Sequence, residues 1–173
     1  VVPGVELSTE HRLILAADAH AAHPAGTAVS VELHLLGYQF DPQNAALNAK
    51  LAELEAIRRE RNEKLAETLN ALGYPVDLAA LAAASKGGYV GKPHIARAWV
   101  AQGLIAQLKD AWEPGKRLES PEVKAIRKKK METTEAIALL QQAGGMAVLA
   151  HPGKIRGIGA RDSAAYWTNF AVL

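Results

Sequence analysis

The sequence contains no cysteine, so disulfide bonds and thiolate metal sites are excluded. A metal ion bound by this chain would need histidine, aspartate or glutamate as its ligands. No apolar run approaches the ~18 residues that a membrane-spanning helix requires. No basic start followed by an apolar stretch indicates a signal peptide either. We therefore expect a protein of the reducing cytoplasm with no membrane partner.

A strong excess of either charge is also missing. The 20 basic and 18 acidic residues leave a net charge of +2, which does not by itself indicate nucleic-acid binding. Hydrophobic residues make up 49% of the 173 residues and charged residues 22%, as in a globular protein. The chain opens on Val1 without a methionine, and we expect it to begin inside a longer protein.

The first zone, residues 1–40, has the character of strands. Residues 5–7 predict a short strand behind a Pro-Gly pair, and residues 16–27 read as a loop. Residues 29–36 alternate between polar and apolar side chains, which predicts a half-buried strand. The polar face of that strand would carry Ser30, Glu32 and His34.

The second zone, residues 41–120, is expected to be helical. Asp41-Pro42 is a typical helix start, and leucines spaced three and four apart predict one long helix over residues 44–72. Glycine-containing breaks then separate three shorter expected helices, at residues 78–85, 93–102 and 105–112.

The third zone, residues 121–173, returns to mixed character. Residues 133–143 predict a helix, and residues 146–150 predict a wholly apolar strand that ends at His151. A strand buried on both faces is typical of a parallel sheet or barrel. The order of the three zones therefore predicts an α/β core interrupted by an all-helical insertion.

Three side chains at strand ends or on exposed strand faces could hold a metal ion: Glu6, His34 and His151. One carboxylate and two imidazoles suit Zn²⁺, Mn²⁺ or Fe²⁺. Taken singly, each residue has an ordinary alternative. A histidine on a strand is more often a hydrogen-bonded, half-buried side chain, and a glutamate there is usually solvated.

The sequence segments around these residues resemble, in the same order, motifs of the PHP (polymerase and histidinol phosphatase) family. They are Pro-Gly-Val-Glu-Leu-Ser-Thr at 3–9, His-Leu-Leu-Gly-Tyr at 34–38 and Leu-Ala-His-Pro at 149–152. Gly-Lys-Pro-His-Ile-Ala-Arg-Ala at 91–98 and the segment 135–152 resemble its stand-alone phosphoesterases, which act on nucleoside bisphosphates or short RNA. The resemblance spans residues 1–153, the middle part of such a protein.

The resemblance implies part of a distorted (β/α)7 barrel, with residues 1–40 and 121–173 in the barrel and 41–120 as the helical insertion. It implies Glu6, His34 and His151 as ligands of divalent metal ions (Mn, Fe or Zn, up to three in the family). It also implies metal-dependent hydrolysis of phosphate esters, with a phosphorylated small molecule or a short nucleic acid as substrate. Glu32 is a candidate to orient the His34 ring.

The chain also departs from the family pattern. The family's early His-x-His pair with its nearby Asp, and its late Asp-x-His, do not occur; Asp162 has no histidine two residues later. His20 and His23 are spaced three apart and follow Glu6, so they do not replace the early pair. Either a longer parent chain or a second chain completes the barrel. The alternative is a catalytically silent fragment or helical binding module without a complete metal site.

The expected insertion contains candidate phosphate contacts. Arg58 and Arg61 fall on the leucine stripe of the long helix, where the alternative is that their stems simply line its border. Lys92, His94 and Arg97 open a helix after the glycine-rich turn at 87–91, where plain capping is the alternative to phosphate binding. The basic run at 124–130 is expected to be a solvated face. No residue is assigned as a general acid or base.

Overall fold

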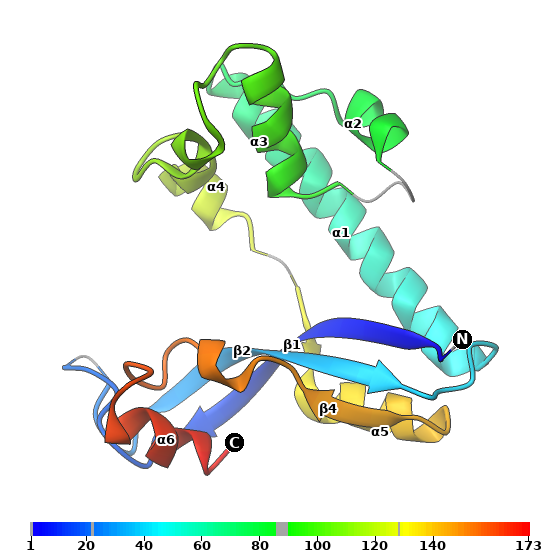
Figure 1. Cartoon of the computed structure of the whole chain (residues 1–173), viewed down its shortest axis with the longest axis vertical. Coiled ribbons are helices and arrows are strands. Elements are labelled where there is room, and N and C mark those ends of the chain that lie inside the picture. The colour runs from blue at the N-terminus through cyan, green and yellow to red at the C-terminus, as the bar shows by residue number, and fades with distance from the viewer. Residues whose placement is uncertain (1, 22, 86–89, 128) are drawn as a thin grey trace. The chain divides into compact units, whose positions relative to one another are not determined.

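The computed structural model describes residues 2–21, 23–85, 90–127 and 129–173. The chain divides into two compact units. The sheet unit comprises Val1–Ala52 and Lys130–Leu173, and the helical unit comprises Glu53–Lys129. The α-helices and the strands β1, β2 and β4 are labelled in Figure 1.

A four-stranded mixed sheet organises the sheet unit. The long strands β1 (Gly4–Ile14) and β2 (Ala28–Tyr38) pair antiparallel along their whole length, from Gly4↔Tyr38 to Ile14↔Ala28. The short strand β3 (Met131–Glu132) runs parallel to β1, and β4 (Met146–Leu149) runs antiparallel to β2. The strand order is β3-β1-β2-β4.

The two faces of this sheet differ because side chains alternate along each strand. One face is buried under α5 (Thr133–Gln142), α6 (Ala164–Phe170) and the segment before α6, and it includes Leu7, Leu13, Val31, Leu33 and Leu35. The other face carries the polar side chains of both long strands, including Glu6, Ser8, Glu10, Glu32 and His34. The hairpin therefore presents a polar surface on a well-packed base.

Gly37 on β2 allows the close approach of α5. A Cβ atom at Gly37 would lie 2.4 Å from Cδ2 of Leu140, a fully buried residue of α5. Any other residue type at this position would require the Leu140 side chain or its surroundings to shift.

The helical unit is built from most of α1 (Ala45–Ala71), followed by α2 (Leu78–Ala84), α3 (Lys92–Ala101) and α4 (Pro121–Ala125). The 3₁₀ helices η1 (Leu108–Trp112) and η2 (Arg117–Glu119) lie between α3 and α4. Its core brings the leucine stripe of α1 against α3 and the residues that follow, and includes Leu65, Leu69, Ile95, Trp99 and Leu118.

Most elements expected from the sequence are present, with four corrections. The long helix begins at Ala45, because the side chain of Asn44 caps it by accepting a hydrogen bond from the Leu47 N–H at 2.9 Å. The helix expected over 105–112 is only the 3₁₀ helix η1. The first strand is much longer than residues 5–7, because the alternation of buried residues continues to Leu13.

The fourth correction concerns the expected buried parallel strand at 146–150, which is wrong. β4 is antiparallel and pairs with β2 at one end of the strand order, and Met146 and Val148 remain 51% and 42% exposed. An apolar run reports composition, and composition alone does not distinguish an edge strand from a central one.

In the described parts of the chain, no helix combines the length and apolar character needed to cross a bilayer.

Candidate metal centre

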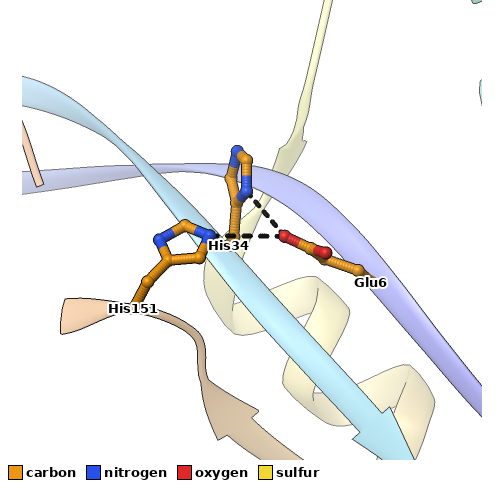
Figure 2. A group of neighbouring side chains, drawn as sticks. All are labelled: Glu6, His34 and His151. Atoms are coloured by element: carbon orange, nitrogen blue, oxygen red, sulfur yellow. Dashed lines mark hydrogen bonds and ion pairs between the residues drawn. The ribbon is translucent and has the colours of Figure 1, made fainter. Parts of the chain in front are cut away.

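Glu6, His34 and His151 converge from three neighbouring strands on the polar face of the sheet (Figure 2). The strand register explains the first two. His34 on β2 lies opposite Ser8 on β1, so Glu6, two residues before Ser8, is its diagonal neighbour on the same face. His151 joins them from the loop directly after β4, which is the other neighbour of β2.

The end of β4 directs His151 toward the pair. The N–H of Ala150 donates to the carbonyl of His34 at 2.8 Å, which fixes the chain beside β2. His151 then adopts a left-handed conformation, with φ 32° and ψ 61°. That conformation is unfavourable for a non-glycine residue by about 1–2 kcal/mol, and it ends the strand and turns the next residues away.

One carboxylate oxygen lies between the two imidazoles. His34 Nδ1 is 2.8 Å from Glu6 Oε1, and His151 Nε2 is 3.4 Å from the same oxygen (Figure 2). The two rings lie 4.9 Å apart at an angle of 69°. Each of the three residues offers one potential ligand atom, and these three atoms all lie within 4.8 Å of one another.

A second group of residues contacts His34 on its other nitrogen. Ser8 Oγ lies 3.4 Å from His34 Nε2, and Glu32 Oε1 lies 3.5 Å from it. Glu32 is itself tied to Lys130, whose Nζ is 3.0 Å from its Oε2. These contacts limit rotation of the His34 ring, which matches the role expected for Glu32 from the sequence.

The electrostatics favour an ionised carboxylate at both positions. Hydrogen bonds from His34 and then from His151 hold the pKa of Glu6 below its ordinary value of 4.5. Burial acts to raise the pKa of Glu32, but the hydrogen bond and charge of Lys130, together with His34, outweigh it and lower this pKa as well. Two carboxylates therefore flank the imidazoles across the neutral pH range.

The donor set fits a divalent transition-metal ion. Bonds of about 2.0–2.2 Å to nitrogen and oxygen place the ligands of one ion roughly 3–4 Å apart, so small side-chain movements bring these donors into range. The side chains of Glu6, His34 and His151 are 50%, 31% and 41% exposed, which leaves an open side for solvent or substrate. Three protein ligands with an open position are typical of catalytic rather than structural metal sites.

Lys92 and its neighbours lie in the helical unit. Lys92 is the first residue of α3, and its Nζ donates to the carbonyl of Leu118 at 3.0 Å. Burial, and then the positive charge of Arg61, lower the pKa of Lys92. The Nε of Arg61 is buried and has no hydrogen-bond partner in the described parts of the chain. The negative charge of Glu119 acts in the opposite direction and raises the pKa of Lys92.

The other expected phosphate contacts are more dispersed. His94 Nδ1 accepts a hydrogen bond from the Gly91 N–H at 3.1 Å, so one ring nitrogen caps α3. Arg97 is exposed on α3 and Arg58 is half-buried on α1. Of the glycine-rich turn at 87–91, residues 87–89 lie outside the described residues.

The basic run at 124–130 contains ion pairs at both of its ends. Lys124 pairs with Glu119 at 2.9 Å, and Lys130 pairs with Glu32. Lys128 lies outside the described residues. Lys130 is thus a contributor to the surroundings of His34 that sequence reasoning missed. Ser8 was also missed, although strand alternation from Glu6 places it on the same face.

No family model matches the chain. Among curated proteins it is 28% identical over 167 residues to the 5'-3' exoribonuclease Rnm of Salmonella typhimurium, covering 96% of this chain and 48% of the relative. It is 27% identical over 123 residues to the 3',5'-nucleoside bisphosphate phosphatase of Chromobacterium violaceum, covering 70% and 42%. The chain thus spans about half the length of the curated relatives it matches.

Two solved structures have a similar fold. One is a proposed metal-dependent phosphoesterase from Bifidobacterium adolescentis, with a TM-score of 0.59, 31% identity, and coverage of 86% of this chain and 47% of that one. The other is an amidohydrolase from Chromobacterium violaceum with bound sulfate, with a TM-score of 0.64 and coverage of 90% and 49%. At 23% identity the latter is a likeness of fold alone. Together the relatives support the PHP-like resemblance.

Proposed function

We propose that this chain forms part of a metal-dependent phosphoesterase, in which Glu6, His34 and His151 hold a divalent cation. The observation that carries the proposal is the convergence of these three side chains from β1, β2 and the end of β4. Residues 28 or more positions apart in sequence meet at hydrogen-bond distance on an otherwise solvated sheet face. Such a cluster of ligand-type side chains is unusual on a surface that serves only solubility.

The chain's own residues would do three things at this site. Glu6 supplies negative charge and the two imidazoles supply neutral donors, so the site favours a divalent transition-metal ion. Ser8 and Glu32 fix the ring of His34, and Lys130 keeps Glu32 in place. A cation bound there would supply Lewis-acid chemistry toward a phosphate ester.

The proposed substrates are nucleoside bisphosphates or short oligonucleotides. The names of the relatives support this class, since one is an exoribonuclease and another a nucleoside bisphosphate phosphatase. We also propose manganese, iron or zinc as the metal. In the complete protein, the mixed sheet would belong to a (β/α)7 barrel with further metal ligands.

For the helical unit, we propose that Lys92, His94, Arg97 and Arg58 contact phosphate groups of the substrate. Arg61 joins this set because its buried Nε lacks a partner among the described residues and its charge acts on Lys92. An anion near Arg61 and Lys92 would satisfy the donor and offset the repulsion between the two cations.

The test is hydrolysis by the full chain in the presence of Mn²⁺ or Zn²⁺. Substrates are a nucleoside 3',5'-bisphosphate and a short 5'-phosphorylated RNA, with a generic aryl phosphate for comparison. Glu6→Gln, His34→Gln and His151→Gln should each abolish metal-dependent turnover. Glu10→Gln is the matched control, because Glu10 is an exposed carboxylate on the same face of β1.

Two outcomes would count against this function. Turnover that survives Glu6→Gln would contradict the role of the cluster. A chain that binds metal at the cluster but hydrolyses none of the substrates would support the silent alternative for this part of the protein, with catalysis dependent on the remainder of a longer chain.

A further inference from the structure

The connection between β1 and β2, residues 15–27, carries a second pair of histidines. His20 Nε2 and His23 Nδ1 lie 2.5 Å apart, and the two rings meet edge to face, with centroids 4.2 Å apart and an angle of 84° between their planes. His20 is exposed and His23 is half-buried. Two imidazole nitrogens thus already face each other on a solvent-accessible loop.

The backbone explains why the rings meet. His20 and His23 form an antiparallel bridge, in which the N–H of His23 donates to the carbonyl of His20 at 2.8 Å. The N–H of Ala19 donates back to the carbonyl of His23 at 3.0 Å. Directly opposed residues of an antiparallel pair project their side chains to the same side. The local fold therefore holds the two imidazoles together.

The loop is also anchored to the core of the sheet unit. The side chain of Asn169 on α6, which is fully buried, accepts from the N–H of Ala17 at 2.8 Å and donates to the Ala17 carbonyl at 2.9 Å. Closer to the tip, Asp18 Oδ1 accepts from the N–H of Ala25 at 2.8 Å. Ala17, Asp18 and Ala25 are thus held by hydrogen bonds, which lowers the conformational entropy that His20 and His23 would lose on binding a ligand.

We propose that His20 and His23 chelate a divalent transition-metal ion of the kind that imidazole prefers, such as Zn²⁺, Ni²⁺ or Cu²⁺. Bonds of about 2.0–2.1 Å place two adjacent nitrogen ligands roughly 3 Å apart, so the rings need only open slightly. The cation takes the place of the proton between the two facing nitrogens. The donating ring releases that proton to solvent and takes one up on its other nitrogen, so both rings bind as neutral imidazoles. Water or an external ligand completes the coordination.

This second site is separate from the one formed by Glu6, His34 and His151. Glu6 lies eight residues before Ile14, the end of β1, which corresponds to roughly 26 Å of strand. The bound ion would link His20 to His23 within the connection between the two long strands. This proposal stands whether or not the proposed phosphoesterase function does.

The test is Zn²⁺ binding to the full chain in a His34→Gln/His151→Gln background, which removes both imidazoles of the first candidate site. Equilibrium dialysis counts the bound ions, and NMR of the histidine ring nitrogens identifies the ligands. In this background one ion should bind, and the ring signals of His20 and His23 should shift together. The double substitution His20→Gln/His23→Gln should remove that binding, whereas His11→Gln/His94→Gln, which removes two other histidines, should retain it.

Chelation makes a sharper prediction than surface binding does. Each single variant, His20→Gln or His23→Gln, should lose as much affinity as the double variant, because one ligand alone does not form the chelate. If each single variant retains half of the bound zinc, or if the double variant binds like its His34→Gln/His151→Gln parent, the proposal is wrong. The ring-nitrogen signals of the unsubstituted chain provide the same test without any substitution in the loop, since they must shift at His20 and His23 on zinc addition.

Discussion

Gly37→Ala should destabilise the sheet unit through a single methyl group. The new Cβ would lie 2.4 Å from Leu140 Cδ2 and 3.1 Å from both Leu140 Cδ1 and Val5 Cγ1. Ordinary contacts between such atoms are about 3.5–4.0 Å, so one side must move by roughly 1 Å. Leu140 is fully buried, and protein interiors are packed too densely for its side chain to move without cost.

The expected cost is about 1–3 kcal/mol in the free energy of unfolding, the usual range for overpacking a tight core. Part of the strain will be relieved by displacement of β2. His34 lies three residues before Gly37 on that strand, so the affinity of the candidate metal centre should fall as well. A loss of both stability and metal affinity from one methyl group on the opposite face of the sheet would show that packing under the sheet positions the site.

Urea unfolding of the two proteins measures the change, with Gly4→Ala as control. Gly4 is on the neighbouring strand, where an added Cβ meets nothing closer than 3.6 Å, so this variant should stay within about 0.5 kcal/mol of the parent. The double variant Gly37→Ala/Leu140→Ala should cost less than the sum of its parts, because the new methyl occupies space that Leu140 vacates. Additive costs, or a Gly37→Ala variant as stable as the parent, would refute this reasoning.

Three further predictions concern hydrogen bonds and charge. Asn169→Ala removes both bonds to Ala17 and should cost about 2–4 kcal/mol by urea unfolding, with faster hydrogen exchange in the connection between β1 and β2; unchanged exchange there would contradict its anchoring role. The pKa of Glu6 is lowered in the folded chain, so its contribution to stability is present above pH 4.5 and is lost as the pH falls through the lowered pKa. Carboxyl NMR titration should show that His34→Gln raises this pKa, and an unchanged value would exclude the hydrogen bond as its cause. Arg61→Met removes a buried donor that lacks a partner among the described residues, so it should preserve or raise stability by up to about 1 kcal/mol while weakening phosphate binding; a large loss of stability would show that Arg61 has a structural role.

The helices and one long strand could be predicted from periodicity. The leucine stripe defines α1 to within a residue or so at each end, and the alternation in residues 29–36 defines β2. β1 was underestimated because its second half carries charged residues on one face, which reads as a loop without knowledge of its partner strand. The edge position of β4 was missed because an apolar run carries no information about how many strands flank it.

The members of the candidate centre could be named from motifs, but their arrangement could not. Glu6 and His34 meet because the register places His34 opposite Ser8, and His151 meets them because β4 pairs with the far side of β2. Lys130 contacts Glu32 from a segment that no local pattern links to β2. Such pairings depend on the whole sheet, so only the tertiary structure reveals them.

The most direct test of the metal centre is to locate the ion. Crystals of the full chain grown with Zn²⁺ should give an anomalous-scattering peak about 2.0–2.2 Å from a Glu6 carboxylate oxygen and from one ring nitrogen each of His34 and His151. The same peak should be absent from Glu6→Gln crystals. A chain saturated with zinc that shows no peak among these three side chains would contradict the account.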